Sequence, residues 1–361
     1  MSRRARDLVR PEVLAQKAYA VAPASGMVKL DAMENPYALP PDLAREMGDR
    51  LARVAVNRYP DPTSTGLRRR LREAMGIPES LGILLGNGSD EIIQIVTTAL
   101  ARPGAVALAP EPSFVMYRMS AAAAAMRFEG VALRDDFTLD DSALAAAMAA
   151  HRPALTWLAY PNNPTGNLFP REAILRAVRE APGLVAVDEA YYPFSGGETM
   201  LGEVGRHPNL LLVRTVSKLG LAGLRLGLAI GPADWIDELE KLRPPYNVNV
   251  LTMAAAELLL EHHRVFEDQA AAIVAERARL EAALDRMPGA RRFPSAANFV
   301  LARFPDAVGT HEALKARGIL VRNLHGSHPL LANCLRLTVG TAGENAKLIE
   351  ALASVEIPFH A

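Results

Sequence analysis

Short apolar runs recur along the middle of the chain, separated by longer segments in which apolar positions follow helical spacing. Clear examples of the short runs occupy 105–110, 154–160, 184–187 and 210–213. Runs of this length without polar alternation are typical of strands buried on both faces of a parallel sheet. Their alternation with helical segments over 41–246 predicts a large α/β domain built on a mostly parallel sheet.

The rest of the chain divides into an N-terminal arm and a smaller C-terminal domain. We expect the arm over 1–40. Two adjacent prolines in RPPYN, residues 243–247, end the preceding helix and mark a boundary. A long helical stretch over 250–287 then leads into the body of an α+β domain, 247–361, with strands around NFVLARF and CLRLTVG.

The composition argues against several classes of function. The 361 residues carry 40 basic and 40 acidic side chains, so no net charge favours nucleic acid or a membrane surface. The basic N-terminus lacks the apolar segment of a secretory signal, and no apolar stretch is long enough for a transmembrane helix. The single cysteine, Cys334, excludes an intramolecular disulfide and fits a reducing cytoplasm. The histidines show no metal-ligand spacing, so we expect no metal site.

Two ionisable residues stand at the ends of strand-like runs thirty residues apart. Asp188 ends the run LVAVD, and Lys218 follows the run LLLVRTVS. Ligands of open parallel sheets bind at the carboxyl ends of the strands, so we expect both side chains to enter one crevice. A carboxylate and a lysine meeting there suit pyridoxal 5'-phosphate. The amine can react with the cofactor's aldehyde, while the carboxylate keeps the pyridine nitrogen protonated.

Each of these residues also has an ordinary explanation. Asp188 could cap a helix, and Lys218 could be a solvated surface residue. The chain has only six lysines, which makes one placed directly after a buried strand harder to explain as surface filler. The neighbouring motifs decide between the two interpretations.

The turn sequence YPNNPTG, residues 160–166, supplies a third candidate. Pro164 and Gly166 break both helix and strand, so this segment must be a loop. Asn163 can donate a side-chain N–H to the cofactor's phenolic oxygen, and Tyr191 offers a second hydroxyl to the same oxygen. Asn-Pro turns are common, but the order of asparagine loop, acid strand and lysine strand favours the functional interpretation.

The segment GNGSDEIIQIVTTAL predicts a phosphate-binding helix N-terminus. Its glycines allow close backbone approach, Ser89 is a good N-cap, and Asp90 and Glu91 fill the first turn. Free N–H groups and the positive end of the helix dipole attract a phosphate, although such a turn also occurs without a ligand. Further candidates to contact the cofactor are Ser217 and Arg225 at the phosphate, and Phe114 as a stacking or ordinary core aromatic.

Taken in order, the motifs GNGSDE, YPNNPTG, VDEAYYPF and SKLGLAGLRLG resemble those of the fold type I pyridoxal-phosphate-dependent aminotransferases. The segments 18–37 and 58–71, with SAANFVLARF, GILVRNL and CLRLTVGTAGEN, narrow the resemblance to the histidinol-phosphate aminotransferases. It extends from about residue 15 to about residue 352. It implies a homodimer in which each large domain has a seven-stranded, mostly parallel sheet and each small C-terminal domain is α+β.

The resemblance also implies a role for individual residues. Lys218 becomes the catalytic lysine. The other residues that it places at the cofactor are Ser89, Asp90, Glu91, Phe114, Asn163, Asp188, Tyr191, Ser217, Arg225 and, from the second subunit, Tyr59. The residues that it places at the substrate are Tyr19, Asn35, Arg322 and Arg336. Among these, Arg336 grips the substrate carboxylate, and Arg322 and Tyr19 are the candidates for the distal substrate phosphate.

The chain departs from the family pattern at three places. It has MENP at 33–36 where the family often has NENP, and Phe114 where many members have tyrosine. The loop between Lys218 and Arg225 is one residue shorter than in many members. These departures leave the expected chemistry unchanged and suggest a subgroup.

The reaction expected from the resemblance interconverts histidinol phosphate and 2-oxoglutarate with imidazole-acetol phosphate and glutamate, as part of cytoplasmic histidine biosynthesis. Two alternatives share the cofactor site: a lyase similar to the threonine-phosphate decarboxylases, and an aromatic amino acid aminotransferase. A gene regulator with an aminotransferase-like domain would need an N-terminal DNA-binding domain. The first strand-like segment begins at Met27, which leaves no room for one.

Overall fold

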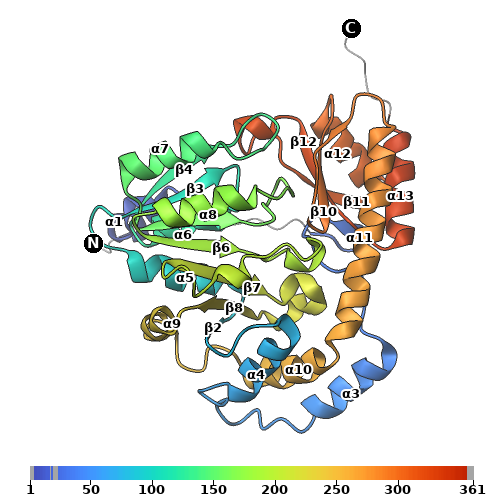
Figure 1. The fold of residues 1–361 in the computed structure, drawn as a ribbon. Coiled ribbons are helices and arrows are strands. Elements are labelled where there is room, and N and C mark those ends of the chain that lie inside the picture. The colour runs from blue at the N-terminus through green and yellow to red at the C-terminus, as the bar shows by residue number, and fades with distance from the viewer. Residues whose placement is uncertain (1–3, 17, 19–22, 356–361) are drawn as a thin grey trace.

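A seven-stranded sheet forms the centre of the molecule (Figure 1). The computed structural model describes residues 4–16, 18 and 23–355. Its strands run, in spatial order, β2 (Gly82–Gly86), β8 (Gly227–Gly231), β7 (Leu210–Thr215), β6 (Leu184–Asp188), β5 (Leu155–Ala159), β3 (Val106–Glu111) and β4 (Arg127–Ala132). Only β8 runs antiparallel to its neighbours in this sheet. The expected mostly parallel α/β sheet is therefore confirmed.

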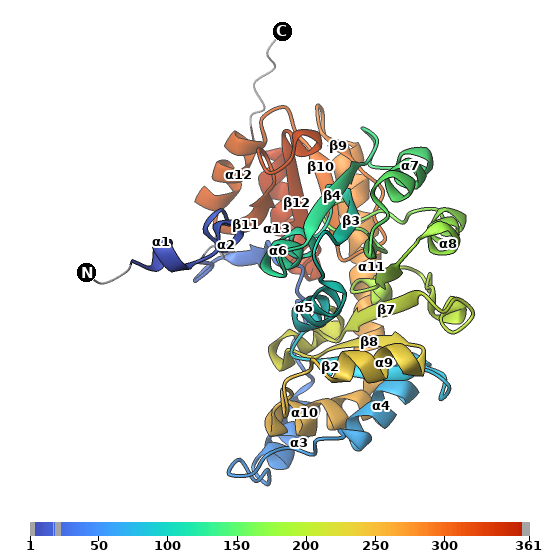
Figure 2. The same ribbon diagram turned by 90° about the vertical axis from the view of Figure 1, so that its left-hand side faces the viewer.

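Alternate residues of each central strand face opposite layers of helices. Val185 and Val187 belong to one core, while Leu184 and Ala186 belong to the other. The helices are α7 (Asp141–His151) and α8 (Arg171–Glu180) on the first face, and α5 (Ser89–Leu100), α6 (Val115–Ala123) and α9 (Ala233–Glu240) on the second. Figure 2 shows α7 and α8 on the opposite side of the sheet from α5. Because both faces are covered, the central strands read as continuous apolar runs.

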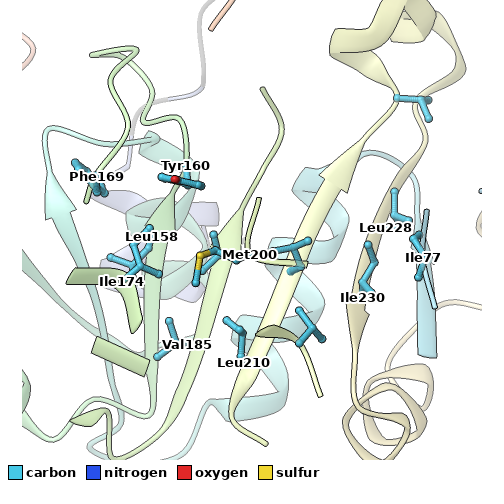
Figure 3. Close-up of a cluster of buried hydrophobic side chains, with 14 of the residues drawn as sticks. Ile77, Leu158, Tyr160, Phe169, Ile174, Val185, Met200, Leu210, Leu228 and Ile230 are labelled. Atoms are coloured by element: carbon cyan, nitrogen blue, oxygen red, sulfur yellow. The ribbon is translucent and has the colours of Figure 1, made fainter. Parts of the chain in front are cut away.

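The first of these cores continues across the sheet and beyond it. Figure 3 shows Leu158, Val185, Leu210 and Ile230 on neighbouring strands, with Met200 among them. The same cluster extends into three helices that pack together at one end of the molecule: α3 (Pro41–Leu51), α4 (Thr65–Met75) and α10 (Val250–Glu261). Helix α10 thus packs with α3 and α4, and the division of the chain near residue 247 remains a prediction.

A second sheet of five strands carries a core of its own. Its spatial order is β1 (Val28–Leu30), β11 (Ile319–Asn323), β12 (Cys334–Thr338), β10 (Phe299–Arg303) and β9 (Arg291–Arg292). The core lies between this sheet and three helices, α11 (His263–Asp285), α12 (Ala307–Ala316) and α13 (Ala342–Ala353). Strand β1, which comes from the N-terminal part of the chain, pairs with β11. The small sheet therefore contains strands from both ends of the sequence.

The helical stretch expected over 250–287 is two helices rather than one. The break falls at His262, whose backbone leaves the helical region with φ −101° and ψ 28°. Helix α10 packs against the large unit, whereas α11 runs along the small sheet, so the change of partner requires a change of direction (Figure 1). Two short helices, α1 (Ala5–Leu8) and α2 (Pro11–Leu14), lie in the arm. None of the helices described by the structure combines the length and apolar character that a bilayer-spanning segment needs.

Candidate active site

A cavity of about 400 Å³ opens where the central strands of the large sheet end. Ala159, Asp188 and Thr215, the last residues of β5, β6 and β7, all line it. Lys218 lines it as well, one turn after β7. Parallel strands place their carboxyl ends at one edge, which is why residues from separate motifs converge here. The expectation that Asp188 and Lys218 enter one crevice is met.

Asp188 is buried, and hydrogen bonds hold both of its carboxylate oxygens. The Tyr117 hydroxyl donates to Oδ2 over 2.8 Å, and the Ala190 backbone N–H donates to Oδ1 over 3.0 Å. Burial raises the pKa of this carboxyl to about 6, while the two hydrogen bonds act in the opposite direction. The Asp188 carboxyl is therefore mostly ionised at neutral pH and takes up a proton more readily than an exposed aspartate does.

Lys218 lies in a tight turn, Ser217–Leu221, that includes Gly220 at φ 136°. Its Nζ donates to the Ala32 carbonyl over 3.3 Å and lies 5.8 Å from the centre of the Tyr191 ring. Burial, and after it the positive charge of Arg336, lower the pKa of the Lys218 amine to about 8. A lysine with a lowered pKa is the form that acts as a nucleophile or base.

Asn163 and Arg336 join the two parts of the fold across the cavity. Arg336 Nη1 donates to Asn163 Oδ1 over 2.7 Å, and Arg336 Nη2 donates to the Asp31 carbonyl over 2.9 Å. Asn163 follows β5 in the large sheet, while Arg336 belongs to β12 in the small one. Since Oδ1 accepts from arginine, the asparagine presents its amide N–H groups to the remaining space.

The start of α5 forms a cradle for an anion together with Arg225. Gly88 has φ 87°, and a Cβ at this position would lie 2.6 Å from the Arg225 guanidinium. Arg225 Nη1 donates to Ser217 Oγ over 3.3 Å, and its Nη2 lies 3.8 Å from Asp90 Oδ2. The N-cap is Gly88 and not Ser89 as expected, because the left-handed φ places the helix boundary one residue earlier. Ser89 and Asp90 still line the cavity.

Aromatic and sulfur-containing side chains close the cavity. Phe114 lines it, and so does Tyr191, whose hydroxyl donates to the Met33 sulfur over 3.2 Å. Met33 has φ 54°, with its backbone N–H and C=O held by Thr338 and Asn298. Met33, the first residue of MENP, is therefore held in a defined position by hydrogen bonds to both of its backbone polar groups.

A second cavity of about 400 Å³ shares Met33, Phe114, Tyr117 and Asn163 with the first. Arg322 and Arg336 both line it, and they are paired neighbours on β11 and β12. The two cavities are neighbours that share these four residues; the amine of Lys218 and the carboxylate of Asp188 line the first, and the two guanidinium groups line the second. This second cavity is suited to an anionic ligand of small size.

Some residues expected at the site lie elsewhere. Glu91 lines neither cavity, because its carboxylate turns to the Asn87 N–H and the Asn247 side chain. Asn35 also lines neither: its amide donates to the Leu219 carbonyl and to Gln269, which ties the strand β1 segment to α11. Neither cavity lining supports these two assignments, which stay predictions.

Tyr59 lies outside both cavities of this chain. Tyr59 is 80% exposed and stacks on Tyr246, with ring centres 4.5 Å apart. Tyr19 lies outside the described residues.

The sequence interpretation missed residues that the structure places in contact with the site. Tyr117 lines both cavities and donates to Asp188, and Thr215 donates its hydroxyl to Ser217. A signal for Tyr117 did exist. It follows Phe114 by three residues in a helical segment, and that spacing places two side chains on one face.

The residues present fit pyridoxal phosphate. A buried carboxylate, a lysine of lowered pKa and an amide lie around one cavity. At its edge the Gly88 backbone leaves room for the Arg225 guanidinium at the start of a helix, which matches a phosphate.

Comparison with known proteins agrees with the geometry. The sequence profile of aminotransferases of class I and II matches residues 25–352. A histidinol-phosphate aminotransferase from Chromobacterium violaceum is 56% identical over 96% of this chain and 97% of its own length. One named histidinol-phosphate aminotransferase 2, from Cupriavidus pinatubonensis, is 54% identical over 96% of each chain. The crystal structure of histidinol-phosphate aminotransferase from Sinorhizobium meliloti, in complex with pyridoxal 5'-phosphate, has a TM-score of 0.86 at 23% identity and covers 98% of both chains.

Proposed function

The chain belongs to the aminotransferases of class I and II, and from this premise we propose that it transfers an amino group between histidinol phosphate and 2-oxoglutarate. The products are imidazole-acetol phosphate and glutamate, and the reaction is reversible. The cofactor is pyridoxal 5'-phosphate. The observation that carries the proposal is the meeting of Asp188, Lys218 and Asn163 around one cavity, where Asn163 also accepts a hydrogen bond from Arg336.

The cofactor, when bound, supplies an aldehyde that accepts the amino group and a ring that stabilises the electrons left when the Cα–H bond breaks. Asp188 is proposed to hold the ring nitrogen, since it is the anionic acceptor at the end of β6. Lys218 is proposed to bind the cofactor aldehyde and then to move a proton at the substrate Cα. Its pKa of about 8 keeps part of the amine neutral at physiological pH.

Asn163 and the cradle at α5 are proposed to hold the rest of the cofactor. Asn163 can donate from its amide nitrogen to the phenolic oxygen, because its oxygen already accepts from Arg336. Ser89, Ser217 and Arg225 are proposed to bind the phosphate, and Phe114 to cover one face of the ring.

The two arginines that line the second cavity are proposed to bind the anionic groups of the substrates. Arg336 is buried, and its planar guanidinium can grip a carboxylate of 2-oxoglutarate through two parallel bonds. Arg322, its cross-strand neighbour, is proposed to bind the distal phosphate of histidinol phosphate. One site can thus accept different anions in the two half-reactions.

We further propose that the active form is a cytoplasmic homodimer. Tyr59 and Tyr246 form an exposed aromatic stack, and Val56 and Leu251 expose large apolar side chains as well. Exposed apolar groups of this kind favour burial against a second copy. In such a dimer Tyr59 would reach the cofactor phosphate of the neighbouring subunit. A single buried cysteine is compatible with a reducing compartment.

A half-reaction assay tests the proposed function. The holoprotein is mixed with single amino donors, and the cofactor spectrum is followed as the amino group is transferred. Histidinol phosphate should convert the cofactor fastest, and 2-oxoglutarate should restore it. Phenylalanine and tyrosine would react best if the protein were an aromatic amino acid aminotransferase, and carbon dioxide release from threonine O-phosphate would identify a decarboxylase. A cofactor spectrum that changes neither with histidinol phosphate nor with the aromatic amino acids would contradict the proposal.

A further inference from the structure

Tyr117 connects two of the residues proposed to contact the cofactor. It lies on α6 with 1% of its surface exposed. Its hydroxyl donates to Asp188 Oδ2 over 2.8 Å, and its ring packs edge-on against Phe114 with centres 5.7 Å apart. A buried phenol in contact with both groups is placed to influence the cofactor without touching its reacting atoms.

The orientation of the phenol is fixed from behind. Its ring stacks on Trp157 of β5, with centres 4.9 Å apart and planes inclined by 2°. Trp157 is itself fully buried between the sheet and the helices of the second face. The hydroxyl therefore has a defined direction, and its position is determined by the scaffold rather than by a ligand.

We infer that Tyr117 is a positioning residue that keeps the Asp188 carboxylate ionised and oriented toward the nitrogen of the cofactor ring, an inference that rests on the proposed function. With Tyr117 on Oδ2 and the Ala190 N–H on Oδ1, each oxygen keeps one further lone pair. The carboxylate can then accept from the ring nitrogen without rotating. Deletion of the phenol would remove one of the two constraints on that orientation.

The Tyr117 hydroxyl also affects the pKa of the Asp188 carboxyl. Burial raises the pKa of Asp188 to about 6, and the negative charges of Asp90 and Glu189 act in the same direction. Arg225 lies near Asp90, and Arg214 pairs with Glu189. Lys218 lines the same cavity. The Tyr117 hydrogen bond lowers the pKa of Asp188, so its loss should leave more of the carboxyl protonated at neutral pH.

The test is Tyr117→Phe, which deletes one oxygen and keeps the ring stack. Apoprotein is titrated with pyridoxal phosphate, and the dissociation constant is measured from pH 5 to pH 8. We expect roughly tenfold to a hundredfold weaker binding at neutral pH, the usual range for a lost hydrogen bond to a charged group. The acid limb of the binding profile should move to higher pH by about one unit. The matched control is Tyr160→Phe, which removes a buried hydroxyl that donates to Glu198 rather than to Asp188.

Each outcome decides the inference. An unchanged dissociation constant in Tyr117→Phe would overturn it. So would weaker binding with an unmoved acid limb and a lowered melting temperature, because that is the pattern of a purely structural residue. Failure of the wild-type protein to bind pyridoxal phosphate would instead contradict the proposed function. A second variant, Trp157→Phe, keeps the Tyr117 hydroxyl and the Asp188 carboxylate and weakens the ring stack behind Tyr117. It should move the limb less than Tyr117→Phe, and a larger movement would also overturn the inference.

Discussion

Arg336 donates a hydrogen bond from Nη1 to Asn163 Oδ1 over 2.7 Å, and this contact joins the small sheet to the loop after β5. Both side chains are buried. The proposed substrate arginine is therefore in direct contact with the residue proposed to bind the phenolic oxygen of the cofactor. Occupation of the substrate site can alter the hydrogen bonding of Asn163 and so reach the cofactor.

The first prediction concerns this contact. Arg336→Lys keeps the positive charge but loses the fork that binds a carboxylate through two bonds. The kcat/KM for 2-oxoglutarate should fall about tenfold to a hundredfold, as expected for a lost charge-assisted bond of ~1.5–3 kcal/mol. The cofactor dissociation constant should rise in the same variant, because Asn163 loses its partner. An Asn163→Ala variant that binds the cofactor as tightly as the wild type would contradict the proposed link.

The second prediction concerns Lys218. Lys218→Ala should abolish transamination and leave the fold intact, because no other amine lines the cavity among the described residues. Reduction of the wild-type holoprotein with borohydride should attach the cofactor covalently to Lys218, as peptide mapping would show. Attachment to a different lysine would contradict the assignment.

The lowered pKa of Lys218 has a consequence for stability that is separate from activity. The folded protein releases this proton near pH 8, while the unfolded chain holds it to about pH 10.5. The unfolded state thus binds more protons between these values, so stability rises with pH across that window. Lys218→Met should increase the free energy of unfolding of the apoprotein at pH 7. The gain over the wild type should shrink as pH rises from about 8 to 10.5. A gain that is constant with pH would show that the substitution acts through packing.

The third prediction concerns the ion pair directly behind the site. Glu189 and Arg214 are almost fully buried, 2.8 Å apart, and next in sequence to Asp188 and Thr215. Arg214→Met leaves a buried carboxylate without its partner, which typically costs ~3–5 kcal/mol. The double variant Glu189→Gln with Arg214→Met should recover part of that loss. Denaturant unfolding of the apoprotein measures both, and a double variant less stable than the single one would contradict the pairing argument.

The sequence predicted the fold and the centre of the site for a physical reason. Strands buried on both faces must be apolar, so a polar residue at the end of one stands out, as Asp188 does. Parallel strands place their carboxyl ends at one edge of the sheet. The position of Lys218 near Asp188 follows from this, because Lys218 comes directly after a neighbouring parallel strand. The register of the small sheet, which pairs Arg322 with Arg336, depends on contacts distant in sequence, and no local pattern indicated it.

The structure gives Glu91 and Asn35 hydrogen-bond partners away from the two cavities, for identifiable reasons. Neighbouring residues on an α-helix point about 100° apart, so Asp90 at the cavity turns Glu91 away from it. Helical geometry could have excluded Glu91 from the site. Asn35 lies in an irregular segment without periodicity, and its contacts to Leu219 and Gln269 join parts of the chain far apart in sequence. No sequence pattern gives the direction of such a side chain.

The fourth prediction concerns shared sites in the proposed dimer. Lys218→Ala and Tyr59→Ala should each be impaired alone, because every site would need lysine from one subunit and tyrosine from the other. After the two variants are mixed and allowed to exchange subunits, one site in each mixed dimer has both wild-type residues. Activity should therefore rise above that of either variant. Light scattering shows whether the protein is dimeric, and mixtures without recovered activity would contradict the shared site.

The last prediction concerns the choice between histidinol phosphate and unphosphorylated histidinol. Arg322 lines the second cavity beside Arg336, and it lies on β11, the strand that pairs with β12. A charge-assisted bond to a desolvated phosphate contributes roughly 1.5–3 kcal/mol, so Arg322→Ala should lower kcat/KM for histidinol phosphate about tenfold to a hundredfold. Histidinol has no phosphate to lose contact with, so its kcat/KM should change little and the gap between the two substrates should narrow. The cofactor dissociation constant serves as the control and should not change, since Arg322 does not line the first cavity, which contains Asp188 and Lys218. If both substrates lose the same factor, Arg322 supports the shape of the site and another residue must read the phosphate.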